Sequence, residues 1–196
     1  MRTIRRLLEH LTWANKELLA GLREQPNASG EIGRLFRHIL IAERVWVTRL
    51  EGGSSAHLTL WEESDIAPLE ELARDNERRY KRYIAGLSES DLDRMLDYAN
   101  QSGVRFRTSI RDILIHVALH GQYHRGQINN ALRRQAGSPV ALDYILLTQV
   151  PYRPNCRKGI FIMQAQIEFV CVTVCEIARE GHVSERASRI FITNYV

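Results

Sequence analysis

The sequence repeats apolar residues at spacings of three and four in four long segments, which is the period of an amphipathic α-helix. In the first segment this pattern predicts a helix over residues 2–24. In the second segment the apolar stripe continues as far as Leu50, and a run that begins at Gly52 ends it. We therefore predict that the first two helices form a helical hairpin.

The other two helical segments lie on either side of a change of pattern. A third helix is predicted over residues 68–87. Between residues 91 and 107, two short apolar runs flank Asn100-Gln-Ser-Gly, which has the residues of a turn, so we expect a short β-hairpin or an extended loop. Ser109, with an acidic residue three positions later, opens a fourth helix that continues to about Gln135.

Composition narrows the class of protein but not its partner. Hydrophobic residues make up 44% of the chain and charged residues 26%, which excludes a disordered chain and suits a globular one. The net charge of +4 is compatible with an acidic partner but requires none. Arginines on the predicted third helix alternate with acidic residues, so we interpret them as a solvated face and expect no nucleic acid partner.

The sequence changes character after Pro151. Residues 160–178 are mostly apolar but contain four polar side chains, so they make a poor membrane span and a fair fifth helix, and we expect no membrane partner. The three cysteines all lie in this part, and Cys171 and Cys175 are more typical of core thiols than of metal ligands. An odd number of cysteines without a secretory signal favours a cytoplasmic location.

Histidines give the strongest indication of function. His116, His120 and His124 stand four apart on the fourth helix, so neighbours are offset by about 40° and about 6 Å, and the outer two by about 80° and about 12 Å. Either adjacent pair can share a metal ion, whereas the outer pair cannot. His38, on the apolar stripe of the second helix, is the candidate for a third ligand, although such a histidine is more often a hydrogen-bonded core residue.

Three stretches in this order resemble the DinB family, also called DinB/YfiT-like proteins, which are four-helix bundles. The stretches are Leu11-Thr-Trp-Ala-Asn-Lys-Glu, His38-Ile-Leu-Ile-Ala-Glu-Arg-Val-Trp and His116-Val-Ala-Leu-His-Gly-Gln-Tyr-His-Arg-Gly-Gln. The resemblance covers about residues 1–150 and implies an all-α fold with a four-helix bundle. Residues 151–196 are left as a C-terminal extension of unknown role that adds a further helical segment.

The resemblance also implies a divalent metal, commonly zinc or nickel, held by His38, His120 and His124. The resemblance thereby selects the pair His120 and His124. Spacing alone could not distinguish this pair from His116 and His120. His116 is then expected to be a core residue or a partner of a ligand, with direct substrate contact as the alternative. Relatives include thiol-dependent isomerases and S-transferases, and bundles of this kind often form homodimers.

Three neutral imidazoles leave a metal ion with its full charge and with open coordination positions, which is the layout of a catalytic site. Bound water would give a hydrolase, and a bound low-molecular-weight thiol would give a transferase. We predict a metal-dependent thiol S-transferase or hydrolase that acts on a small-molecule substrate. The alternative is a noncatalytic, metal-stabilised binding or dimerisation module.

Four other residues near the motifs are assigned from helix geometry. Gln127 falls on nearly the same face as His120 and could orient a ligand, but Gln127 and Arg125 are more often side chains that bond a neighbouring helix or subunit. Glu43 lies about 140° around the helix from His38, so we expect a structural role for it. Tyr123 is expected to serve in packing or subunit contact.

Overall fold

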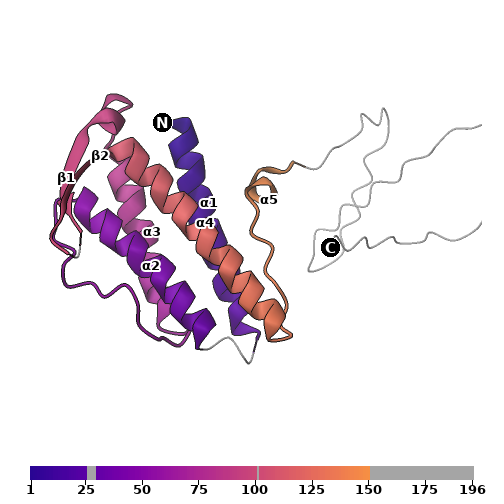
Figure 1. The fold of residues 1–196 in the computed structure, drawn as a ribbon. Helices are drawn as coiled ribbons and strands as arrows, with labels where there is room; N and C mark the ends of the chain where they lie inside the picture. The colour runs from indigo at the N-terminus through magenta and orange to yellow at the C-terminus, as the bar shows by residue number, and fades with distance from the viewer. Residues whose placement is uncertain (26–29, 101, 151–196) are drawn as a thin grey trace, which may run out of the picture. The chain divides into compact units, whose positions relative to one another are not determined.

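Four long helices dominate the structure. The computed structural model describes residues 1–25, 30–100 and 102–150, and its helices and strands belong to one compact unit, Met1–Gln149. The long helices, drawn in Figure 1, are α1 (Arg2–Arg23), α2 (Glu31–Leu50), α3 (Leu69–Ala85) and α4 (Ile110–Arg134). The shorter elements are a 3-10 helix η1 (Ser90–Asp93), strands β1 (Met95–Ala99) and β2 (Arg105–Ser109), and α5 (Tyr144–Thr148). The helices predicted over 2–24 and 68–87 are confirmed to within two residues at each end.

The fourth helix begins as its sequence predicts. The Ser109 hydroxyl accepts a hydrogen bond from the backbone N–H of Asp112 at 3.1 Å and lies 2.6 Å from its carboxylate. This bond satisfies one of the N–H groups that the first turn of a helix leaves free. The helix ends at Arg134, one residue before the predicted end.

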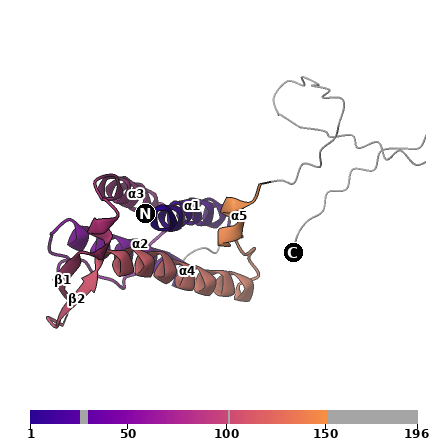
Figure 2. The same ribbon diagram turned by 90° about the horizontal axis from the view of Figure 1, so that it is seen from above.

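The long helices bury their apolar stripes against one another in a closed order. Helix α1 packs against α3 and α4, and α2 packs against the same two helices, as Figures 1 and 2 show. The predicted hairpin of the first two helices is therefore wrong, because α1 and α2 each take α3 and α4 as neighbours. One apolar cluster includes Leu18, Phe36, Ile39 and Ile128, and a second includes Leu8, Val47, Tyr80 and Ile113. Side chains from all four long helices contribute to each cluster or pack against it, so burial holds the four together.

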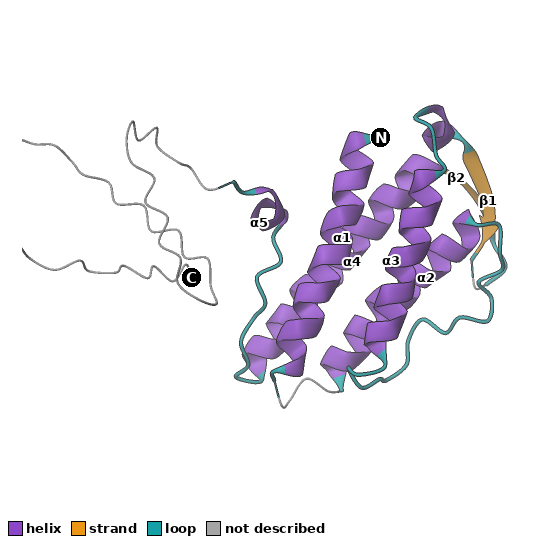
Figure 3. Cartoon of the chain, turned by 180° about the vertical axis from the view of Figure 1, so that it is seen from behind, coloured by secondary structure: helices purple, strands orange, loops and turns teal. Residues whose placement is uncertain are grey.

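The structure also contains a two-stranded antiparallel sheet, so the fold is mostly helical but not all-α (Figure 3). Strands β1 and β2 pair from Met95 opposite Ser109 to Ala99 opposite Arg105. The Asn100 side chain accepts hydrogen bonds from two backbone N–H groups of the turn, and Gly103 takes the left-handed φ of +80° that glycine tolerates. The hairpin alternative of the sequence prediction is therefore the correct one.

A long connection follows α2 and lies back along it. Gly33 allows the close approach, because a Cβ at this position would lie 2.1 Å from the backbone oxygen of Ser64. Arg37 holds the same connection by a hydrogen bond of 2.9 Å to the Thr59 carbonyl and by an ion pair with Glu62. This connection brings Leu60 and Trp61 to the side of α2.

The chain after α4 returns along the long helices toward α5. The Asn129 side chain exchanges two hydrogen bonds with the backbone of Val140, at 2.8 and 2.9 Å. The buried His10 ring of α1 lies 2.9 Å from the Leu142 carbonyl through Nε2. These bonds fix the returning segment across α4 and α1.

Two arginines of α3 pair within the helix, as the sequence predicts: Arg74 with Glu70 and Glu71, and Arg78 with Asp75. Arg79 pairs instead with Glu51, just after α2. Within the described residues no helix is long and apolar enough to cross a membrane. The predicted fifth helix over residues 160–178 lies outside the described residues.

Candidate metal centre

His38 lies in the interior on α2, with only 5% of its surface exposed. Its Nδ1 atom is 3.2 Å from the carbonyl oxygen of Leu60, in the connection that lies along α2. A carbonyl can only accept, so Nδ1 carries the proton and donates it. Nε2 is left with a free lone pair that faces α4.

His120 and His124 stand one turn apart on α4 and face α2. Nδ1 of the buried His124 ring lies 2.7 Å from Oε1 of Gln127, to which it donates its proton. The lone pair of His124 is therefore also on Nε2. Gln127 thus orients a histidine of its own helix, whereas the sequence interpretations were that it orients a bound ligand or bonds a neighbouring helix or subunit.

The Nε2 atoms of the three rings converge on one point. Nε2 of His120 lies 3.3 Å from that of His38 and 3.2 Å from that of His124. The ligand atoms of all three lie within 4.8 Å of one another. Two nitrogens bound tetrahedrally to one zinc ion at 2.0–2.1 Å are themselves about 3.3 Å apart. The three side chains are therefore positioned to hold a metal ion.

Hydrogen bonds among the rings cannot satisfy this arrangement. With their Nδ1 protons committed elsewhere, His38 and His124 both present acceptors at the centre. His120 has at most one Nε2 proton to donate between them. The centre therefore has more lone pairs than protons, which favours a bound cation.

The surroundings keep the His120 and His38 rings neutral at pH 7. Burial, assisted by the neighbouring His124 and His38, lowers the pKa of His120 to about 4. Burial also lowers the pKa of His38, although the bond to the Leu60 carbonyl opposes the shift. Neutral imidazole is the form that binds a metal, so these two side chains do not first have to lose protons.

Two aromatic side chains flank the centre. The Trp61 ring stacks on His38 with centroids 3.6 Å apart and an interplanar angle of 5°, and its edge faces His124 at 6.0 Å. The Tyr123 ring packs edge-on against His124 at 5.0 Å while remaining 66% exposed. Tyr123 therefore has a packing contact, as expected. Trp61 packs directly against the histidines, a contact that was not predicted from the sequence.

His116 lies beside the centre but not in it, and the expectation of a core residue is wrong. The residue lies one turn before His120 on α4, and its side chain is exposed to solvent. Its ring packs edge-on against Trp46, with centroids 5.4 Å apart, and lies 5.5 Å from the His120 ring. The pair 120/124, rather than 116/120, meets His38.

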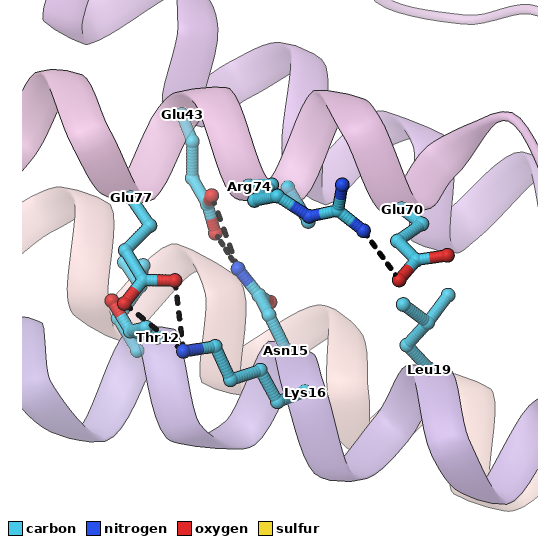
Figure 4. A pocket seen from close by; sticks show the side chains of 10 residues that line it. Thr12, Asn15, Lys16, Leu19, Glu43, Glu70, Arg74 and Glu77 are labelled. Carbon is cyan, nitrogen blue, oxygen red and sulfur yellow. Dashed lines mark hydrogen bonds and ion pairs between the residues drawn. The ribbon is translucent and has the colours of Figure 1, made fainter.

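Glu43 belongs to a separate polar cluster in the interior, as its angular distance from His38 predicts. Its carboxylate, 2% exposed, accepts hydrogen bonds from Asn15 at 2.9 and 3.1 Å and from Asn76 at 3.3 Å. Figure 4 shows Glu43 and Asn15 at a small cavity of about 90 Å³, beside the ion pair of Lys16 with Glu77. Burial raises the pKa of Glu43 against the opposing effects of Arg125 and both asparagines.

Arg125 completes this cluster from α4. The side chain is 1% exposed and donates to the Leu11 carbonyl at 3.2 Å and to Oδ1 of Asn15 at 2.6 Å, while Nη2 lies 3.9 Å from Glu43. Gly121 makes room for it, since a Cβ there would lie 2.9 Å from Nη1 of the arginine. Arg125 therefore bonds a neighbouring helix, which is the role that the sequence analysis considered more frequent for such a side chain. Asn15 and Asn76 were missed, because only the fold brings them to Glu43.

Comparisons with known proteins agree with this geometry. A model of the DinB family matches residues 1–154 of the chain. The chain is also 26% identical over 154 residues to Protein DinB of Bacillus subtilis (strain 168). That alignment covers 71% of this chain and 90% of the relative.

Proposed function

Because the chain belongs to the DinB family, we propose that it is a divalent-metal-dependent enzyme with a four-helix-bundle fold, in which His38, His120 and His124 hold zinc or nickel. The observation that carries the proposal is the convergence of three Nε2 atoms, two of which have lone pairs oriented by hydrogen bonds at Nδ1. Two of the three rings are buried, and apolar side chains would fill that space better than imidazoles if packing were their only role.

The metal, when bound, would supply a Lewis acid that lowers the pKa of water or holds a thiol as thiolate. The contacts that the described residues make with the three rings include no carboxylate. Glu43, with its oxygens bonded to two asparagines, is not placed to act as a general base there. A thiol nucleophile needs less help from a base than water does, so we favour a thiol S-transferase over a hydrolase.

Metal analysis of the purified full chain tests the first step. We expect about one divalent ion per chain in the wild type and a large loss of metal in His120→Ala. His116→Ala is the matched control, since it removes an exposed imidazole from the same helix and should leave the metal content unchanged. Equal and negligible metal in the wild type and in His120→Ala would overturn the proposal.

Activity of the metal-loaded protein tests the second step. A panel of low-molecular-weight thiols with electrophilic substrates should give turnover that depends on the metal and is lost in His120→Ala. A metal that raises the melting temperature without any turnover would instead favour the noncatalytic binding or dimerisation module. The predicted homodimer and small-molecule substrate are tested in the same preparations, by light scattering and by the panel.

A further inference from the structure

A second polar pocket lies where the end of α2 meets the hairpin. Its cavity of about 220 Å³ is lined by Arg49, by residues 52–56 and by residues 96–100. Arg49 is eleven residues after His38, about 16 Å further along the helix axis. The pocket is therefore distinct from the histidine centre.

Arg49 is held rigidly in this pocket without a carboxylate partner among the described residues. Its guanidinium carbon lies 4.9 Å from the ring centroids of both Trp46 and Tyr98. Nε donates to the Ser55 hydroxyl and Nη2 to the Ala99 carbonyl, each at 3.0 Å, and both acceptors are neutral. In the described part of the chain, Nη1 has no hydrogen-bond partner, so the side chain is oriented but its charge is not neutralised.

The acidic residues near Arg49 have other partners. Asp97, which lines the pocket, accepts hydrogen bonds from Nε and Nη2 of Arg107 at 2.7 and 2.8 Å. Glu51 pairs with Arg79 of α3. The C-terminal end of α2 contributes only a partial negative charge beside Arg49. Burial lowers the pKa of Arg49, which is the cost of a cation removed from water without a counter-ion.

Two serine hydroxyls at the pocket also have hydrogens to donate. Ser55 Oγ already accepts from Arg49, and Ser54 Oγ accepts from the backbone N–H of Ala56 at 3.4 Å. Among the described residues neither hydroxyl donates a hydrogen bond, so the proton of each is available to another acceptor. The pocket thus combines one unneutralised guanidinium with two hydroxyl donors.

We propose that this pocket binds the carboxylate group of a small molecule. A single cation with neutral donors matches the single charge of a carboxylate, whereas a phosphate dianion usually requires more than one cation. The rings of Trp46 and Tyr98, which are inclined at 75° to each other, contact the guanidinium from two sides and so keep it in place for an anion. The proposal does not depend on the metal.

An NMR titration of the ¹⁵N-labelled full chain tests the proposal, with succinate as the probe, succinamide as its neutral counterpart and inorganic phosphate as the competing anion. Succinate should cause saturable shifts in the amides of residues 52–56 and in the Trp46 indole N–H. Arg49→Gln should weaken binding about tenfold or more. Arg105→Gln, which removes an exposed arginine from the same hairpin, should leave it unchanged.

Ser54→Ala gives a second test in case Arg49→Gln disturbs the loop, because the Ser54 side chain is exposed and its removal should preserve the fold. It should weaken succinate binding severalfold. Equal shifts with succinamide, tighter binding of phosphate, or no effect of either variant would overturn the carboxylate assignment. Titrations with and without zinc separate the two proposals, since succinate binding should persist in a protein that fails to bind metal.

Discussion

Two polar clusters, one around Glu43 and one around His120, lie among the same four long helices and differ in how their hydrogen bonds are satisfied. Around Glu43, side chains from α1, α2, α3 and α4 bond to one another, so the acid and Arg125 share Asn15 between them. Around His120, the outer nitrogens of two neighbouring rings are bonded, but the inner nitrogens converge with too few protons. The first cluster pairs its buried acid with a buried cation, although Nε and Nη1 of Arg125 have no hydrogen-bond partner among the described residues. The second cluster contains no acid, and its acceptors face one another in a geometry that could hold a metal ion. The difference that identifies a functional site is therefore the convergence of acceptors on one point, not interior polarity alone.

The largest expected effect comes from breaking the cluster around Glu43. Arg125→Met leaves Glu43 buried without its cation, and the free energy of unfolding should fall by about 3–5 kcal/mol. Urea denaturation measures the change, and Arg133→Met, at an exposed position of the same helix, should change it little. If Arg125→Met lost metal but kept full stability, the two clusters would not be separable as described.

A smaller effect is expected when the histidine centre loses the support of Gln127. Gln127→Leu removes the acceptor that holds the His124 proton on Nδ1, and metal affinity should fall about 10–100-fold. Competition with a chromophoric chelator measures this, and unfolding of the metal-free protein should be nearly unchanged. Gln135→Leu, at an exposed position just after the helix, is the control.

The two clusters should respond to acid in opposite directions. The pKa of His120 is lowered to about 4, so the unfolded chain binds protons there first, and metal-free protein should lose stability as pH falls from about 6.5 toward about 4. The pKa of Glu43 is raised, so its contribution should instead weaken as pH rises through that pKa.

Urea denaturation of the metal-free protein at several pH values checks both signs. His120→Gln should flatten the acid dependence below pH 6.5, whereas Glu43→Gln should leave that part of the profile in place. A wild-type profile that does not change between pH 6.5 and 5 would contradict the assignment of a buried neutral imidazole to position 120.

The smallest effect should come from Trp61. Trp61→Phe keeps an aromatic ring on His38, whereas Trp61→Ala removes the stacked contact and should cost about 0.5–1.5 kcal/mol. Zinc should change the fluorescence of the wild type more than that of Trp61→Phe, which retains the other two tryptophans. An equal zinc response in both proteins would show that Trp61 does not sense the centre.

The periodic parts of this fold could be predicted from sequence, because helices and caps depend on residues close together in the chain. Ser109 with Asp112 placed the start of α4, and Asn100 with Gly103 indicated the turn of the hairpin. The choice between the pairs 116/120 and 120/124 could not be made from spacing, since both are four apart. It came from the resemblance to a family, and the structure brings 120 and 124 to His38.

Contacts between distant segments were the part that sequence could not supply. Trp61 reaches His38 only because the connection after α2 lies back along that helix, where Gly33 leaves room for it. Asn15 and Asn76 are ordinary polar residues by sequence, and only the packing of the four long helices around one interior makes them partners of Glu43. His116 was misplaced because helical spacing alone does not say where a helix face meets solvent.

His124 and Arg125 are neighbours in the chain whose side chains leave α4 in different directions, one toward α2 and the other toward α1. Together they fix the helix against rotation, because a turn of the axis that displaces either side chain displaces both. Sliding α4 by one turn, about 5.4 Å, would break the bonds to Asn15 and Leu11 along with the histidine geometry. Any movement of α4 that changes the histidine centre would therefore also break the contacts that Arg125 makes with α1.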